Sequence, residues 1–243
     1  MKSNGFFITG TDTGVGKTVV TACLLSLFRN RQLDTGIMKP IETGVDPLCS
    51  SIANSDAKFL MAVGDCEDEF ELVCPVQLTT PASPLQAARM ENRVIEPDAI
   101  LKSFDKLARR HKWMLVEGIG GLLVPICPGY FVADLIKDLG LPIILVSRAH
   151  LGTLNHTLLT LWTARERGIG VSGVILNHMD DGDPSNVEKG QGKLIEEISG
   201  IPVLGECPFL GPISPEIFSD AEGRELIAKN FDLNLPGLSS SES

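Results

Sequence analysis

The chain has 243 residues, of which 43% are hydrophobic, and carries a formal net charge of −10 at pH 7. This length allows one large domain with a well-buried core, and the acidic balance argues against a general role on nucleic acid or on a membrane surface. No apolar run could cross a bilayer, the N-terminus does not resemble a secretory signal, and the six cysteines form no Cys-x-x-Cys pair, so we expect a reduced, cytoplasmic protein without a zinc site.

Short apolar runs alternate with longer amphipathic stretches along the chain. Residues 6–8 form the first run, and a helical pattern over 18–30 follows it. Further strands are predicted at 35–39, 113–116, 143–146, 171–176 and 203–204, and further helices at 154–167 and 187–198. Strands rich in Val, Ile and Leu that alternate with helices are typical of a parallel sheet covered by helices on both faces.

The sequence shows no internal repeat and no linker, which favours a single domain. We expect this domain to cover residues 1–237, and the serine-rich residues 238–243 to form a disordered tail. The polar and less regular segment 43–84 is typical of loops over an active site. The predicted architecture is therefore an α/β fold in one domain.

The first predicted strand leads into GTDTGVGKT, residues 10–18. The common phosphate-binding pattern has four residues between its first glycine and Gly-Lys-Thr, whereas five lie between Gly10 and Gly16 here. Backbone amides of such a loop, with the helix N-terminus behind it, attract phosphate oxygens; Lys17 would neutralise phosphates and Thr18 would bind Mg²⁺. The alternative is an ordinary glycine-rich turn, but the succession of strand, Gly-Lys-Thr and helix favours a nucleotide site.

Two charged residues follow later strands. In WMLVEGIGG, residues 113–121, Glu117 ends an apolar strand at the edge where α/β sheets bind ligands, and the glycines after it permit close backbone approach. Lys39 follows the second strand and is held in place by Pro40. From the residues alone, a solvent-facing acid and a surface lysine remain open as alternatives.

Asp56, the segment 151–157 and two histidines are less specific signals. Asp56 stands at a predicted helix start, where a capping role is the more ordinary reading. Residues 151–157 lead from a strand into a helix, whose free amides could hold a carboxylate. His150 and His156 lack a partner grouping for catalysis, so we interpret them as surface or capping residues.

The motifs GTDTGVGKT, KPIETG, NSDA, VEGIGG, LGTLNH and VILNH together resemble the dethiobiotin synthetase family, in the same order and spacing over about residues 6–210. The family's phosphate loop has the same extra residue. The resemblance implies a P-loop NTPase-like domain that uses ATP and Mg²⁺ to join CO₂ or bicarbonate to 7,8-diaminononanoate. A carbamate and a carbamic–phosphoric mixed anhydride would lead to dethiobiotin, ADP and phosphate.

The resemblance also assigns roles by position. Catalytic roles fall to Lys39, Lys17 and Thr13, and the Mg²⁺ ligands are Thr18, Asp56 and Glu117. The nucleotide positions are Gly14, Val15, Gly16, Lys17, Thr18, Val19, Asp56, Glu117, Gly118, Ile119, Gly120, Asn177, His178, Pro208, Phe209 and Leu210. The substrate positions are Thr13, Lys39, Thr43, Gly120, Gly152, Thr153, Leu154 and Asn155. The family implies a homodimer with its substrate site at the subunit interface, in which residues 152–155 reach the substrate of the other subunit.

Three positions depart from the family pattern. Gly14 replaces an acid that some members carry, Thr43 replaces a serine, and His178 replaces a common aspartate in the adenine-reading pair. The last change leaves the preference for ATP over other nucleoside triphosphates open.

Two rival functions fit the sequence less well. A cobyrinic-acid amidase would need a glutaminase domain with a nucleophilic cysteine, for which this sequence has neither the length nor a suitable cysteine. A nucleotide switch of the chromosome- or septum-positioning type carries a lysine shortly before Gly-Lys-Thr, where this chain reads Asp-Thr-Gly at 12–14. The synthetase reading is therefore preferred.

Overall fold

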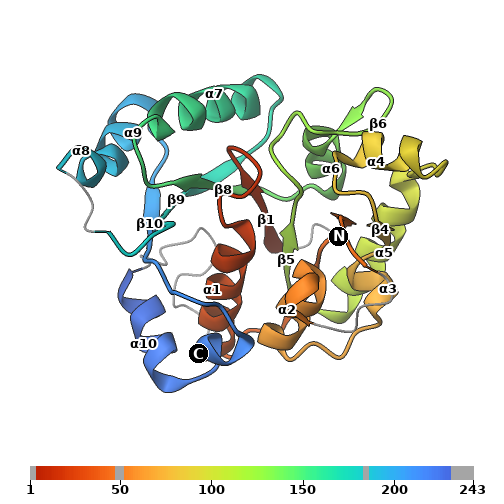
Figure 1. The fold of residues 1–243 in the computed structure, drawn as a ribbon, viewed down its shortest axis with the longest axis horizontal. Coiled ribbons are helices and arrows are strands. Elements are labelled where there is room, and N and C mark those ends of the chain that lie inside the picture. The colour runs from red at the N-terminus through yellow and green to blue at the C-terminus, as the bar shows by residue number, and fades with distance from the viewer. Residues whose placement is uncertain (1–3, 47–51, 183–185, 231–243) are drawn as a thin grey trace.

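The computed structural model describes residues 4–46, 52–182 and 186–230 (Figure 1). Its centre is a six-stranded, fully parallel sheet in the order β10-β9-β8-β1-β5-β2. The strands are β1 (Asn4–Gly10), β2 (Thr35–Met38), β5 (Trp113–Glu117), β8 (Ile143–Arg148), β9 (Val171–Asn177) and β10 (Val203–Cys207). The predicted parallel α/β sheet is confirmed.

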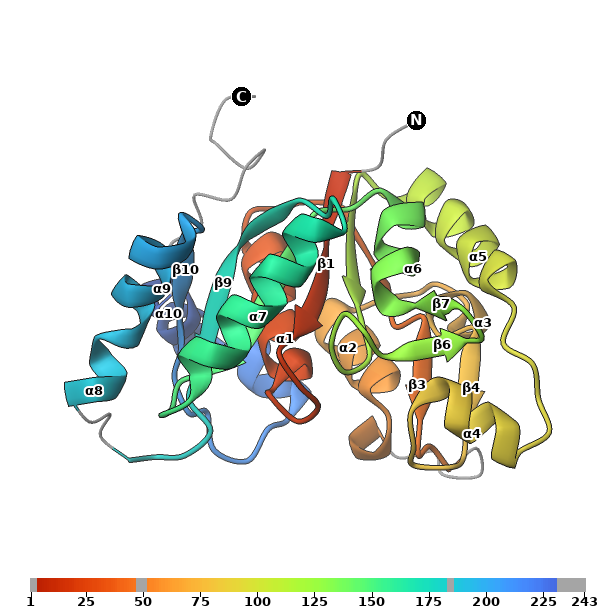
Figure 2. The same ribbon diagram turned by 90° about the horizontal axis from the view of Figure 1, so that it is seen from above.

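Helices cover both faces of this sheet (Figures 1 and 2). One face carries α1 (Lys17–Asn30), α2 (Asp56–Gly64) and α10 (Ala221–Asn230). The other carries α5 (Pro97–Arg110), α6 (Val132–Leu139), α7 (Thr153–Glu166) and α9 (Gln191–Ser199). The short helices are α3 (Phe70–Val73), α4 (Pro84–Met90) and α8 (Asn186–Lys189).

The core explains why the strands are apolar throughout. In β1, every residue from Gly5 to Gly10 is buried, because both faces of the strand are covered. Phe6 and Ile8 pack into the cluster under α1, whereas Phe7 packs into the cluster under α5 and α6. Alternate side chains thus serve two separate cores.

Two pairs of short strands extend the structure beside the main sheet. β3 (Ile41–Thr43) pairs in parallel with β4 (Val76–Leu78), and β6 (Pro125–Cys127) pairs antiparallel with β7 (Tyr130–Phe131). None of the helices in the described ranges has the length and apolar character that a membrane span requires.

Several predicted elements differ from the structure. Segment 43–84 combines loops with the regular elements α2, α3 and β4; the buried side chains of α2 recur three residues apart, at Ala57, Leu60 and Val63. The helix expected over 187–198 is interrupted at Gly190 and forms α8 and α9. The weak strand at 203–204 continues to Cys207. The predicted tail 238–243 lies outside the described residues.

The chain order of the strands sets the position of the site. From β1 the chain passes to β2, returns to β5 beside β1, and then continues to β8 on the other side of β1. Ligands of open α/β sheets bind beyond the carboxyl ends of the strands at such a reversal. The loop after β1 lies at this edge, where the arrowheads of Figure 2 point.

Candidate active site

A cleft of about 680 Å³ opens at the carboxyl ends of β1, β2 and β5. Its volume falls in the range of small-molecule sites, roughly 300–1,000 Å³. The predicted site residues that line it are Thr13, Gly14, Gly16, Lys17, Thr18, Val19, Lys39, Thr43, Asp56, Glu117, Ile119 and Gly120. Segments that lie up to about a hundred residues apart in the sequence therefore meet in one place.

The loop after β1 has the geometry of an anion cradle. Gly16 is the N-cap of α1 with φ 87°, so the helix begins without a capping side chain and its first-turn amides face the loop. A Cβ on Gly16 would lie 1.9 Å from Nδ2 of Asn177, which only glycine avoids. Lys17 folds back and its Nζ donates to the backbone oxygen of Asp12 at 3.1 Å. Val15, also predicted to contact nucleotide, has its side chain buried in the core.

Lys17 is a buried cation without a carboxylate in direct contact in the described structure. It is 7% exposed, and this burial lowers its pKa to about 8, although Glu117 and Asp56 nearby partly oppose the shift. A cation held away from water at a helix N-terminus is suited to bind an anionic ligand.

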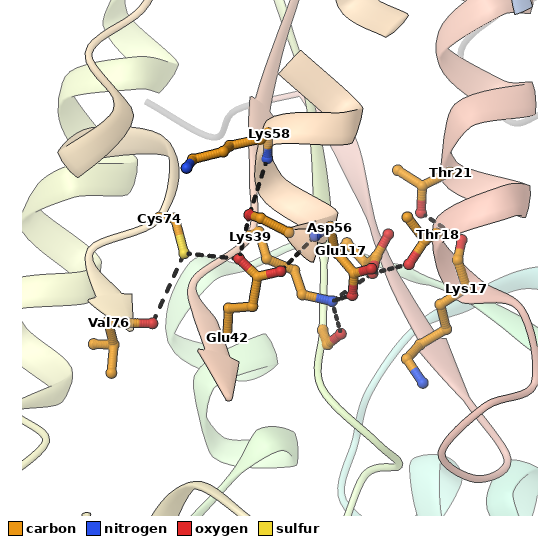
Figure 3. Close-up of polar contacts among 12 residues, drawn as sticks. Lys17, Thr18, Thr21, Lys39, Glu42, Asp56, Lys58, Cys74, Val76 and Glu117 are labelled. Atoms are coloured by element: carbon orange, nitrogen blue, oxygen red, sulfur yellow. Dashed lines mark hydrogen bonds and ion pairs between the residues drawn. The ribbon is translucent and has the colours of Figure 1, made fainter. Parts of the chain in front are cut away.

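Lys39 joins two of the acidic residues that line the cleft, Asp56 and Glu117 (Figure 3). Its Nζ lies 2.5 Å from Oε1 of Glu117 and 2.8 Å from Oδ2 of Asp56. Thr18 Oγ1 donates to the same Glu117 oxygen at 2.9 Å. Lys39 is 3% exposed and Glu117 is fully buried, so the alternatives of a surface lysine and a solvent-facing acid are wrong.

The charges in this cluster stabilise one another. Burial alone would lower the pKa of Lys39, but the carboxylates of Glu117 and Asp56 outweigh it and hold that pKa above its ordinary value. Burial likewise opposes ionisation of Asp56, yet the Lys39 ammonium keeps the pKa of Asp56 below its ordinary value. Lysine and aspartate therefore remain charged at neutral pH.

The residues present fit a magnesium ion. Oε2 of Glu117 is buried and has no hydrogen-bond partner among the described residues. Glu117, Asp56 and Thr18 supply oxygen ligands, which Mg²⁺ prefers, and Mg²⁺ commonly binds through one or two carboxylates together with phosphates of a substrate. The described residues contain no cluster of three or more His, Cys, Asp or Glu side chains that could hold a metal without such a substrate.

The start of α2 corrects the reading of Asp56 as a cap. Ser55 is the N-cap, and its Oγ accepts the backbone N–H of Lys58 at 3.2 Å. Asp56 is the first helical residue, and its carboxylate is directed at Lys39 instead. Glu42 also lines the cleft, from β3. The sequence analysis did not predict it as a site residue, although it stands inside the motif KPIETG.

The predicted adenine-reading positions lie behind the phosphate loop. Asn177 ends β9, and its Nδ2 donates to the backbone oxygen of Val15 at 2.9 Å. His178 contacts Oε2 of Glu206 at 2.8 Å, and its backbone N–H donates to the backbone oxygen of Cys207 at 2.9 Å. The predicted stretch 208–210 follows directly, so both segments meet here, although neither lines the main cleft.

The positions 152–155 lie at the start of α7. Thr153 is buried and contacts Oγ of Ser147 at 2.5 Å, whereas Gly152 and Asn155 are exposed. None of the four lines the main cleft of its own chain. A second cavity of about 400 Å³ lies between α7 and the phosphate loop, lined in part by Thr13 and Leu159.

His150 and His156 lie where surface or capping residues are expected. His156 is exposed on α7, and His150 contacts the backbone oxygen of its neighbour Leu151 at 2.6 Å. Neither residue lines the main cleft.

The sequence is similar to known proteins over most of its length. A family model described as an AAA domain matches residues 4–217. An ATP-dependent dethiobiotin synthetase of Thermodesulfovibrio yellowstonii is 41% identical over 94% of this chain and 96% of its own length. Those of Nitrosopumilus maritimus and Bacillus subtilis subsp. natto are each 35% identical, over 96% and 87% of this chain and 98% and 90% of their own lengths.

Solved structures with low sequence identity share the fold. The MinC:MinD cell division protein complex of Aquifex aeolicus matches with a TM-score of 0.55 and 12% identity, and it covers 93% of this chain and 94% of that chain. The cell division ATPase MinD of Pyrococcus furiosus matches with a TM-score of 0.52 and 15% identity, covering 94% of this chain and 96% of that chain. These similarities support the P-loop NTPase-like fold.

Proposed function

The chain belongs to the ATP-dependent dethiobiotin synthetase family, and we propose the way in which its cleft performs that reaction. The substrates are 7,8-diaminononanoate, CO₂ and ATP. One amine adds to CO₂ and loses a proton, giving a carbamate. A carbamate oxygen then takes the γ-phosphoryl group and releases ADP, and the second amine attacks the carbamate carbon. Phosphate leaves, and the ureido ring of dethiobiotin is closed.

The observation that carries this proposal is the meeting of Lys17, Lys39, Thr18, Asp56 and Glu117 at one cleft. The reaction forms no covalent bond to the protein. It requires two small reactants to be held beside a triphosphate while negative charge spreads over the transferring group. Two buried lysines and a row of helix-terminal amides provide that environment.

Mg²⁺, held by Thr18, Asp56 and Glu117, would neutralise charge on the phosphates. Lys17 binds phosphoryl oxygens from the loop side. Lys39 enters from β2 and stabilises the carbamate and the transferring group. Thr13 is exposed in the long phosphate loop and lines both cavities, which supports a contact with the substrate amines.

The nucleotide site continues from the phosphate loop toward β9. Gly14 to Val19 surround the phosphates, and the segment 118–120 lies along the nucleotide. Asn177, His178 and the stretch 208–210 read the base. The His178 ring contacts the Glu206 carboxylate, so an imidazole, and not a carboxylate, would contact the base at this position.

The second cavity and the apolar surface beside it favour a homodimer. Leu159 and Trp162 on α7, with Leu123 nearby, are more than half exposed. Large exposed apolar side chains that adjoin a cavity are typical of an interaction surface. A second subunit would cover this face, and residues 152–155 would then reach the carboxylate of the substrate bound to the other subunit.

The family assignment argues against both rival functions, the cobyrinic-acid amidase and the nucleotide switch. The chain covers nearly the full length of curated synthetases, whereas its similarity to MinD is limited to the fold. The site adds a separate argument, because Lys39 and Glu117 direct their charges into the cleft that the phosphate loop shares.

The test is an assay with diaminononanoate, bicarbonate, Mg²⁺ and nucleotide. We expect dethiobiotin and phosphate in equal amounts, with ATP compared against CTP and GTP because of His178. Phosphate release that is unaffected when the diamine is left out would disprove the proposed reaction. For the dimer, sedimentation at assay concentration should give twice the chain mass, and a fully active monomer would contradict the shared site.

A further inference from the structure

The carboxylate of Glu42 lines the cleft but has no part in the proposed reaction. Glu42 lies on β3, three residues after Lys39, and is 5% exposed. Burying a carboxylate is costly unless hydrogen-bond donors compensate for the lost water. The donors that surround Glu42 therefore indicate what its burial achieves.

Both oxygens of Glu42 accept hydrogen bonds from the start of α2 (Figure 3). Oε1 accepts the backbone N–H of Asp56, and Oε2 accepts the hydroxyl of Ser55 at 2.8 Å. The thiol of Cys74 donates weakly to Oε2 at 3.8 Å. Ser55 Oγ in turn accepts the N–H of Lys58 at 3.2 Å. Two amides at the helix start are thus held from β3, one directly and one through Ser55.

Asp56 is consequently held at two points by one short segment. The side chain of Glu42 holds its backbone, and the side chain of Lys39 holds its carboxylate at 2.8 Å. The segment itself is fixed, because Lys39 N–H donates to the backbone oxygen of Val73 at 2.8 Å and Glu42 is paired with Gln77 in the β3–β4 sheet. The position of the Asp56 carboxylate is thereby set relative to Lys39.

We propose that Glu42 is a positioning residue, which fixes the first turn of α2 so that Asp56 stays in place beside Thr18 and Glu117 as a metal ligand. This inference rests on the proposed function, in which these three residues hold Mg²⁺ with the nucleotide. Groups that orient a metal ligand without touching the metal commonly change metal affinity or activity by about 10- to 100-fold when they are removed.

The test variant is Glu42→Gln, which keeps the size of the side chain but replaces one acceptor oxygen with a donor. Mn²⁺ is titrated by electron paramagnetic resonance into enzyme saturated with a non-hydrolysable ATP analogue, so that affinity is read without turnover. We expect Mn²⁺ to bind about tenfold more weakly or worse. In the assay, half-maximal activity should need more Mg²⁺, while KM for the diamine stays unchanged.

Asp134→Asn is the matched control. Oδ2 of Asp134 accepts the backbone N–H of Phe131 at the start of α6, at 2.8 Å, and neither residue lines the cleft. This variant should lower the melting temperature and leave Mn²⁺ affinity unchanged. Ser55→Ala should weaken Mn²⁺ binding in the same direction as Glu42→Gln, by a smaller factor.

Wild-type Mn²⁺ affinity in Glu42→Gln would overturn the positioning role of Glu42, and so would a loss of Mn²⁺ affinity in Asp134→Asn as large as that in Glu42→Gln. Either result would leave the proposed function standing. If Glu42→Gln does not fold, Ser55→Ala decides, and unchanged affinity in that variant overturns the proposal. A wild-type enzyme that binds no Mn²⁺ with the nucleotide analogue would instead remove the metal role of Asp56, and the positioning role would fall with it.

Discussion

Among the described residues, the ion pairs that share a residue form two clusters, at the two ends of the strands of the main sheet. The inner cluster lies at the carboxyl ends of the strands and joins Lys39 to Asp56 and Glu117. The outer cluster lies at the amino ends of β2 and β5, where His111 contacts both Asp34 and Asp68 at 2.8 Å. Both clusters contain short contacts between opposite charges, yet their environments differ.

Both clusters mix buried and exposed groups, since Asp56 is 47% exposed and Asp68 is 7% exposed. Only the inner cluster contains a pair with both side chains buried, Lys39 and Glu117, at 4% and 0% exposure, whereas His111 and Asp34 are 22% and 45% exposed. Exposed pairs contribute little because water screens them, whereas a buried charge must be compensated. The inner cluster also keeps the Glu117 oxygen without a partner in the described residues. The combination of a fully buried ion pair and an oxygen without a partner distinguishes the inner cluster, which is the one that we propose to bind ligands.

The largest expected effect is that of Lys39→Ala. Removing one group that stabilises transition-state charge lowers kcat by about 100- to 1,000-fold. The measurement is the rate of dethiobiotin formation, with circular dichroism to show that the fold is retained. Arg110→Ala in the outer cluster, where Arg110 pairs with Asp68 at 2.9 Å, is the control and should keep wild-type activity. Near-normal turnover in Lys39→Ala would remove that residue from the reaction.

Gly16→Ala should give the next largest effect. A Cβ at this position meets Asn177 and the backbone has φ 87°, so the loop must shift and strain of about 1–3 kcal/mol is expected. Gly140→Ala is the control, since Gly140 has φ 68° but nothing within 4 Å of the added Cβ. Both variants should melt earlier, but only Gly16→Ala should weaken ATP binding, measured by calorimetry. Equal ATP affinity in the two variants would contradict the cradle.

The smallest expected effect is on stability in the outer cluster. Burial would lower the pKa of His111, but hydrogen bonds to Asp34 and Asp68 outweigh it and raise that pKa. A raised folded pKa gives stability that is fully present below about pH 6.5, the ordinary value for histidine, and is lost as the pH rises through the folded pKa.

His111→Gln should therefore cost more at pH 5.5 than at pH 8.5. The difference should stay below about 1 kcal/mol, because the pair is partly exposed. Urea unfolding at the two pH values measures it, and the turnover at pH 7 should match the wild type. A larger loss at pH 8.5 would reverse the assigned sign.

The sheet and the phosphate loop could be predicted because their signals are local. Most strands are rich in apolar residues. Lys39 directly follows β2, Glu117 ends β5, and Lys17 stands at the end of the loop that follows β1, so the common edge of the strands brings them together. The family resemblance added Asp56, which local pattern assigned to a helix cap.

The remaining parts depend on tertiary contacts. Glu42 could not be assigned from its neighbours, because its partners Ser55 and Asp56 reach it only when α2 packs beside β3. The elements of segment 43–84 give little periodic signal because they are short: α3 has four residues and β4 has three. Asn177 was identified by resemblance, whereas its bond to the phosphate loop at Val15 appears only in three dimensions.

The central claim is that the inner cluster transfers a phosphoryl group to a carbamate. Freshly prepared ¹⁸O-labelled bicarbonate, used with diaminononanoate and ATP, tests it directly. The amine attacks the carbamate carbon and the bridging oxygen leaves with phosphorus, so the account predicts one ¹⁸O atom in each released phosphate by mass spectrometry. Phosphate without the label, formed at the same rate as dethiobiotin, would contradict the mixed anhydride and the role assigned to the cluster.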